Sequence, residues 1–201
     1  MNTNLTKKFL GCTFALLVAV PGVALAQEKP ADMPASQAPS AAPANPITQS
    51  EKGLYSFISG TVIAAAQKMP EENYSFKPTP EVRSFGQIVG HVADAQYMFC
   101  SAAIGEANPS KDIEKTKTSK ADLVAAMKDA QAYCMKTFAA MTDAKGAEMI
   151  KMMGFPMARI GVLSLNTAHA DEHYGNLVTY MRLKGLVPPT SENQGPPPAA
   201  K

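Results

Sequence analysis

The sequence lacks several features that identify common classes of protein. It has no run of basic residues, and its 19 basic residues, less Lys7 and Lys8 near the start, leave 17 against 17 acidic ones. A near-neutral chain of this kind argues against nucleic acid as a partner. Apart from a short apolar run near its start, it has no long hydrophobic segment, which argues against a stable membrane anchor.

Both ends of the chain are poor in residues that could build a core. Residues 1–26 are typical of a secretory signal, with a basic start, an apolar run and small residues before a cleavage site. Residues 27–46 are predicted to be a disordered Pro/Ala-rich linker, and residues 188–201 a disordered tail. We therefore expect one domain over residues 47–187, in a protein that is secreted or periplasmic after cleavage near Ala26.

Cysteine is scarce as well. Cys12 lies inside the expected signal, which leaves only Cys100 and Cys134. They do not form a Cys-x-x-Cys motif, which argues against a thioredoxin-type redox site. In an oxidising compartment the two can pair as a disulfide, and the alternative is two separate buried thiols.

No stretch shows sustained alternation of apolar and polar residues, and we detect no internal repeat, so the sequence predicts no sheet. Apolar residues instead recur at steps of three and four, which predicts helices over about 47–69, 85–104, 119–141 and 157–184. We expect Asn45 to cap the first helix, Ser84 and Gln87 to form a capping box on the second, and Ser119 to cap the third. Four such helices make an all-α, four-helix bundle.

The stretch between the last two predicted helices is rich in methionine. The residues concerned are Met149, Met152, Met153 and Met157. One interpretation is a short helix over 147–153. Thioethers suit Cu(I), but adaptable Met side chains more commonly fill gaps between helices. A copper site is therefore the minor alternative here.

Histidine is also scarce, and its placement is the most informative feature of the chain. His169 and His173 stand four residues apart on the inner face of the last predicted helix, so their rings share one side of it. His91 lies on the apolar stripe of the second predicted helix. Bundles commonly build metal sites from inward side chains on facing helices, and three imidazoles are a common ligand set for catalytic Zn²⁺. We therefore predict that these three histidines bind one divalent ion, the alternative being ordinary core residues.

A metal-bound imidazole needs an acceptor for its second ring nitrogen. Asp94, one turn after His91, and Asn166 and Glu172, near the pair on the last helix, are the candidates for this role. Glu172 is also a candidate catalytic base.

The string His169-x-x-Glu172-His173 also matches a motif of one class of zinc metallopeptidase. That class needs a further acidic ligand downstream, where only Glu192 remains, and it leaves His91 unused. The peptidase interpretation is therefore disfavoured.

Two parts of the chain carry a resemblance to a known family. They are residues 69–78 with 85–92, and the motif that runs from His169-x3-His173-Tyr174-Gly175-Asn176 to Pro188-Pro189. Over about residues 47–189 the chain resembles the DinB/YfiT-like superfamily of metal-dependent enzymes. The three metal-binding histidines of that family map onto His91, His169 and His173. The family commonly has Arg-Gly-Gln after its last histidine, so the cationic group at that position is missing here.

The resemblance also implies a topology. The four helices of this family run up, down, down, up, so the second and third are parallel. Cys100 and Cys134 would then lie at the same height on neighbouring helices, and the resemblance thereby implies a Cys100–Cys134 disulfide. It also implies a homodimer.

For function, the resemblance implies a metal-dependent transferase or hydrolase that acts on a small molecule and uses Zn²⁺, Ni²⁺ or Fe²⁺. Two alternatives stay open: a non-catalytic metal-binding or stress-related protein, and an interaction module without metal. An open coordination position beside a pocket would favour the enzyme. A site closed by a fourth protein ligand would favour the non-catalytic role.

Overall fold

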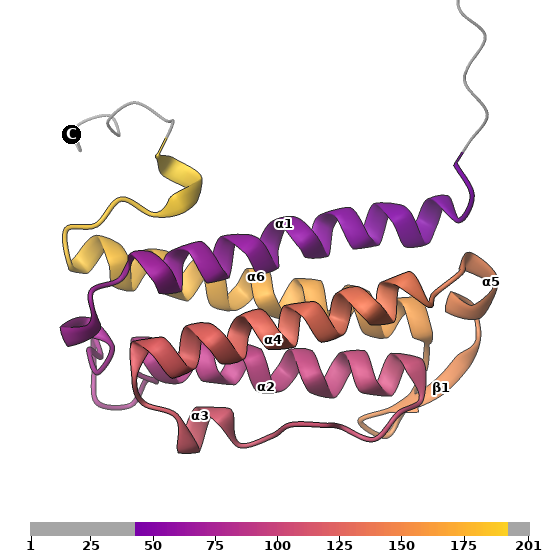
Figure 1. Cartoon of the computed structure of the whole chain (residues 1–201), viewed down its shortest axis with the longest axis horizontal. Helices are drawn as coiled ribbons and strands as arrows, with labels where there is room; N and C mark the ends of the chain where they lie inside the picture. Colours follow the sequence, from indigo (N-terminus) through magenta and orange to yellow (C-terminus); the bar gives the residue numbers. More distant parts are fainter. Residues whose placement is uncertain (1–42, 193–201) are drawn as a thin grey trace, which may run out of the picture. The chain divides into compact units, whose positions relative to one another are not determined.

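Four long helices make up most of the chain that the computed structural model describes, residues 43–192 (Figure 1). Their bounds are Pro46–Lys68 for α1, Phe85–Ile104 for α2, Lys120–Ala139 for α4 and Arg159–Leu183 for α6. The expected all-α bundle is thus confirmed. The signal and most of the expected linker lie outside the described residues.

Six short elements connect or follow these helices. They are η1 (Glu71–Asn73), α3 (Ile113–Thr116), α5 (Asp143–Gly146), β1 (Met149–Met152), β2 (Phe155–Ala158) and η2 (Pro189–Ser191). Of these, α3 packs on α2, on the side away from α1 (Figure 1). Within residues 43–192, no helix is both long and apolar enough to cross a membrane.

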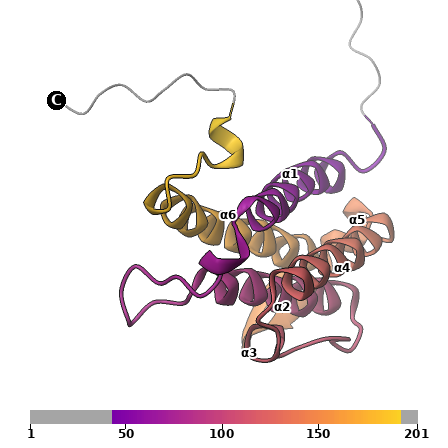
Figure 2. The same ribbon diagram turned by 60° about the vertical axis from the view of Figure 1, so that its left-hand side comes forward.

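The helices run up, down, down, up, as the resemblance implied. Both α1 and α2 pack on α4 and α6, which leaves α1 and α2 diagonal to each other (Figure 2). Near the end of α2, the Ala103 carbonyl accepts a hydrogen bond from Arg159 at the start of α6, so these two helices are antiparallel. At its other end, Gly86 lies beside Leu123, near the start of α4, so α2 and α4 are parallel.

The caps of the two central helices are as predicted. At the start of α2, the Ser84 side chain accepts from the Gln87 N–H and the Gln87 side chain accepts from the Ser84 N–H, which completes the capping box. Gly105 ends the helix with a φ of 84°, a left-handed conformation that glycine adopts without strain. Ser119 caps α4 by accepting from the Asp122 N–H.

The start of α1 differs from the prediction. Asn45 has a φ of 57° and makes no side-chain cap on its own helix. Its Oδ1 instead accepts from the Asp143 N–H, 3.0 Å away. The Asp143 carboxylate in turn accepts from the Ile47 and Thr48 N–H groups, at 3.2 and 2.8 Å. The starts of α1 and α5 therefore cap each other across the fold, which a local pattern does not reveal.

The prediction of no sheet was wrong, as was the helix over 147–153. β1 and β2 form an antiparallel hairpin in which Met152 pairs with Phe155. The turn residues Met153 and Gly154 both have positive φ, 50° and 90°, as a two-residue hairpin turn with the twist of its strands requires. Strands of four residues are too short for alternation to be recognised. Met152 packs in the core, whereas Met149 and Met153 are exposed, which favours packing over copper binding.

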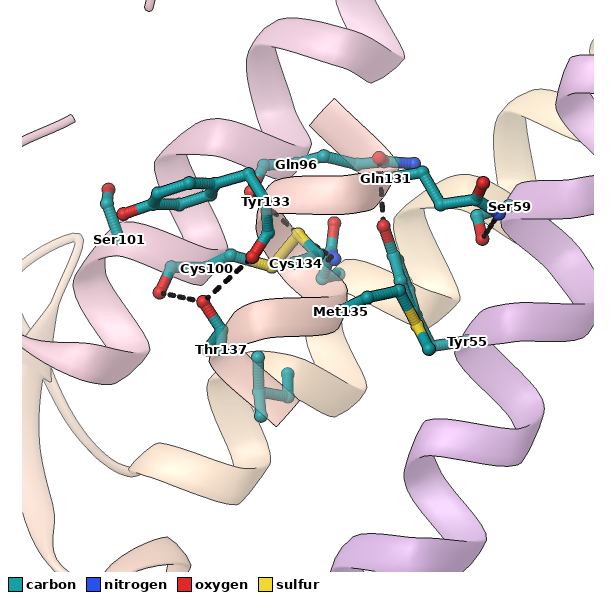
Figure 3. Close-up of a disulfide and its surroundings, with 12 residues drawn as sticks. Tyr55, Ser59, Gln96, Cys100, Ser101, Gln131, Tyr133, Cys134, Met135 and Thr137 are labelled. Atoms are coloured by element: carbon teal, nitrogen blue, oxygen red, sulfur yellow. Dashed lines mark hydrogen bonds between the residues drawn. A yellow bond between two sulfur atoms is a disulfide. The ribbon is translucent and has the colours of Figure 1, made fainter. Parts of the chain in front are cut away.

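A disulfide joins α2 to α4. Cys100 and Cys134 are bonded and fully buried, in a second hydrophobic cluster of the bundle (Figure 3). Nearby, the Tyr55 hydroxyl of α1 donates to Gln96 Oε1 at 2.9 Å (Figure 3). The pairing is the one that parallel α2 and α4 imply.

The first residues of the expected disordered tail are ordered. The 3₁₀ helix η2 returns to the bundle, where the hydroxyls of Tyr174 and Thr190 lie 2.9 Å apart. Arg182 donates to Ser191 Oγ, and Lys68 pairs with Glu192. Contacts from α1 and α6 therefore extend the ordered domain to Glu192, and the rest of the tail lies outside the described residues.

Candidate metal centre

The fold brings all three histidines together. His91 lies in α2, and His169 and His173 lie one turn apart in the antiparallel neighbour α6. The Nε2 atom of His169 is 3.2 Å from that of His91 and 3.2 Å from that of His173. One nitrogen from each ring lies within 4.8 Å of the others.

This spacing fits a single bound ion. Two nitrogens at about 2.0–2.1 Å from one ion, with a tetrahedral angle between them, lie about 3.3 Å apart. The two Nε2 separations that involve His169, 3.2 Å each, are close to that value. Among the described residues, no fourth His, Cys, Asp or Glu joins the group. The three histidines could therefore hold a metal ion and leave a coordination position open.

The electrostatics of the site favour neutral rings for His169 and His173. Burial, followed by the charges of His173, His91 and Arg83, lowers the pKa of His169 to about 4. Burial, followed by the charge of His91, also lowers the pKa of His173. A neutral imidazole has a free lone pair, which metal binding requires. At neutral pH, His169 and His173 are thus in the form that binds metal.

Glu114 of α3 orients His91. Its Oε2 lies 3.0 Å from His91 Nδ1, and its Oε1 accepts from Arg83 Nε at 2.8 Å. With Nδ1–H donating to the carboxylate, the lone pair of His91 is on Nε2, the atom that faces the other rings. Neither Glu114 nor Arg83 was predicted from the sequence, because both lie in connections between the predicted helices.

Asp94 does not contact an imidazole as predicted, but holds the segment that carries Glu114. Its two carboxylate oxygens accept from the N–H groups of Ile113 and Glu114, each at 2.9 Å. Asp94 therefore holds the backbone of α3 and through it Glu114, and its carboxylate makes no hydrogen bond to an imidazole of the described residues. Ile113 is the signal that could have shown this, because it is the only large apolar residue between Ile104 and Leu123, and it is buried.

Asn166 and Glu172, the other two candidate partners of the histidines, do not contact the rings either. Asn166 is buried, but its amide lies 3.5 and 3.6 Å from the sulfurs of Cys100 and Cys134. The Glu172 side chain is exposed and makes no hydrogen bond to any described residue. Neither contacts a ring nitrogen, because the Asn166 amide lies against the disulfide that joins α2 to α4, and Glu172 lies on the exposed face of α6. The Nδ1 atoms of His169 and His173 are buried without a hydrogen-bond partner among the described residues.

The peptidase alternative also fails. Glu192, the acidic ligand that it needs, pairs with Lys68 at the far end of α1. The third member of the histidine group is His91, which that class of enzyme would not use.

A cleft opens beside the histidines. It measures about 760 Å³, a size typical of small-molecule sites. His173 reaches it from α6, and Arg83 and Glu114 border it. A small molecule in the cleft can therefore reach His173, one member of the histidine group.

Comparison with known proteins identifies the family. The sequence profile of the DinB superfamily matches residues 60–177, a span that includes all three histidines. The uncharacterised protein YjoA of Bacillus subtilis is 26% identical over 126 residues, which cover 60% of this chain and 79% of YjoA.

Two solved structures share the fold. The crystal structure of YjoA, a DinB-like protein from Bacillus subtilis, has a TM-score of 0.58 at 23% identity. The match covers 68% of this chain and 92% of the YjoA chain. A DinB-like protein from Bacillus cereus has a TM-score of 0.64 at 16% identity, with coverage of 70% and 95%. These likenesses show the fold, and the matched profile, which spans more than half of the chain, shows that the chain belongs to the DinB superfamily.

Proposed function

We propose that this chain is an exported, metal-dependent transferase or hydrolase that acts on a small molecule at His91, His169 and His173. One observation carries the proposal. Three imidazole nitrogens converge at ligand spacing, without a fourth protein ligand among the described residues, next to an open cleft. An open position beside a cleft favours an enzyme over a site that only binds metal.

The residues have separate parts in this proposal. His91, His169 and His173 would hold Zn²⁺, Ni²⁺ or Fe²⁺, and Glu114 orients His91. Such an ion polarises a substrate group and lowers the pKa of a water or thiol nucleophile. The cleft admits the substrate, and the burial of His173 limits the access of bulk water to the ligands.

Export and dimerisation belong to the same proposal. A signal over residues 1–26 with cleavage near Ala26 would place the protein in the periplasm or outside the cell. The mass of the exported protein tests this, since cleavage after Ala26 leaves a chain that begins at Gln27. Light scattering of the purified protein tests the homodimer. An uncleaved chain or a monomer contradicts the respective part.

The experiment for the site is a metal analysis of the full chain, purified without added metal. We expect about one ion per chain in the wild type and loss of that ion in His173→Ala. Glu172→Gln, one residue away with an exposed side chain, is the matched control and should keep the ion. Unchanged occupancy in His173→Ala contradicts the ligand assignment.

Catalysis needs a second measurement. The metal-loaded and metal-free proteins are compared in ester and amide hydrolysis and in conjugation of a thiol to an electrophile. Turnover that requires the metal and disappears in His173→Ala supports an enzyme. A fully loaded protein without turnover in any of these assays supports the non-catalytic alternative.

A further inference from the structure

One cation borders the cleft beside the histidines, and it is Arg83. Its position is set from both sides: its carbonyl accepts from the Tyr180 hydroxyl of α6 at 2.7 Å, and the next residue, Ser84, caps α2. The remaining charged residues of the cleft lining are Glu81, which is exposed, and Glu114. Arg83 is therefore the only full positive charge that the described lining offers to a ligand.

The Arg83 guanidinium is held by one hydrogen bond and keeps further N–H donors available. Its Nε donates to Glu114 at 2.8 Å, and this is its only side-chain hydrogen bond among the described residues. A guanidinium has five N–H donors in a planar fork, so four remain on the two terminal nitrogens. The side chain is 45% exposed, which leaves these donors accessible from the cleft. Glu114 thus fixes the plane of the group and leaves its outer edge free.

The charge balance of the cleft selects among anions. Glu114 is shared between Arg83 and His91, and Glu81 adds a second negative charge. One guanidinium against two carboxylates gives these three residues a net charge of −1, so direct contact with Arg83 must hold an anion, and a ligand with a single negative charge is opposed least. A phosphate monoester, with a charge of about −1.5 to −2 at pH 7, would be repelled more strongly. A carboxylate also matches the planar fork with two parallel hydrogen bonds.

We propose that Arg83 binds a carboxylate of the substrate, so that the histidine site acts on small carboxylic acids. This rests on the proposed function, because it takes the histidine group as the reacting end of the cleft. Arg83 then sets which substrates enter and how they are oriented, while the three histidines serve the chemistry.

The first test uses the metal-free full chain and does not depend on metal. The chain has three arginines, Arg83, Arg159 and Arg182, whose modification by phenylglyoxal can be followed separately by peptide mass spectrometry. We expect benzoate to slow the modification of Arg83 several-fold, and neutral benzamide to have no effect. Arg159 and Arg182 are internal controls and should react at unchanged rates. Equal modification of Arg83 with and without benzoate overturns the proposal, and stronger protection by phenylphosphonate overturns the choice of carboxylate.

The second test uses the Zn²⁺-loaded protein and calorimetry. Succinic acid monohydroxamate and its neutral carboxamide counterpart share a metal-binding end and differ in the distal charge. We expect the acid to bind about tenfold more tightly, the value of one charge-assisted hydrogen bond. Arg83→Gln should abolish this preference, and Arg83→Lys should keep part of it. Glu81→Gln, which removes an opposing charge from the same cleft, should keep or increase it.

The outcomes of the two tests separate the two proposals. A preference for the acid that persists in Arg83→Gln overturns the role of Arg83. If the wild type holds no metal and binds neither hydroxamate, the proposed function fails. The phenylglyoxal experiment then still decides whether Arg83 binds a carboxylate.

Discussion

Gly90 and Glu114 touch through their backbones: a Cβ atom at Gly90 would lie 2.7 Å from the Cα of Glu114, closer than real Cβ contacts come. The short helix α3 can approach α2 only because residue 90 has no side chain. This close approach places the Glu114 carboxylate on His91, the next residue of α2. The geometry of the proposed metal centre thus depends on a glycine that binds nothing itself.

Gly90→Ala should therefore destabilise the protein by about 1–3 kcal/mol, the usual cost of overpacking, and weaken metal binding as α3 is displaced. The matched control is Gly53→Ala in α1, where an added Cβ meets nothing within 4 Å. There we expect stabilisation by about 0.5–1 kcal/mol, because alanine is the better helix former. Urea denaturation measures both. Equal effects of the two substitutions would show that α3 gives way freely.

Glu114→Gln should lower metal affinity by about 10–100-fold, as other substitutions of the carboxylate behind a ligand histidine do. The amide keeps the shape of the side chain but removes the charge that holds His91 Nδ1–H and Arg83. Competition with a chromophoric chelator measures the affinity. Glu172→Gln serves as the control and should bind metal like the wild type. An unchanged affinity in Glu114→Gln would mean that the contact is not needed for binding.

The stability of the metal-free protein should depend on pH in a defined direction. Burial, with the charges of His173, His91 and Arg83, lowers the pKa of His169 to about 4, against about 6.5 in the unfolded chain. Between these values the unfolded chain takes up a proton that the folded chain does not. The free energy of unfolding is therefore highest above pH 6.5 and decreases as the pH falls toward 4.

Urea denaturation at pH 7, 6 and 5 tests this, with His169→Gln as the comparison. The variant should lose less stability on acidification, because it no longer carries this group. Identical pH profiles for the two proteins would contradict the assignment.

Removing the disulfide with Cys100→Ala and Cys134→Ala together should cost about 3–4 kcal/mol in the free energy of unfolding, from the loop entropy of a 34-residue separation. Dithiothreitol should destabilise the wild type by a similar amount and leave the double variant unaffected. If both cysteines of the native, unreduced protein react with a maleimide, the bond is absent.

Local signals were sufficient to locate the four long helices. The Ser84–Gln87 box and Gly105 bracket α2, and both are visible in the sequence as patterns of a few residues. Spacing alone also placed His169 and His173 on one face of α6. With His91 on the inner face of α2, this predicted the group of three histidines that the structure brings together. The two strands of the hairpin were missed because four residues are too few for an alternation of apolar and polar side chains to be recognised.

Partners of the histidines were predicted less well. Asp94, Asn166 and Glu172 were chosen because they are near the histidines in sequence. The carboxylate that contacts His91 comes from Glu114, 23 residues away, and Asp94 serves only to hold its backbone. Sequence proximity along one helix says little about which loop covers its face.

By itself, the sequence determined the four long helices and the faces of α2 and α6 on which the histidines lie, because periodicity and capping are local properties of the chain. Only the tertiary structure decided that Glu114 meets His91 and that Arg83 borders the cleft. Those contacts exist because a connection folds back across α2, over a glycine that leaves room for it.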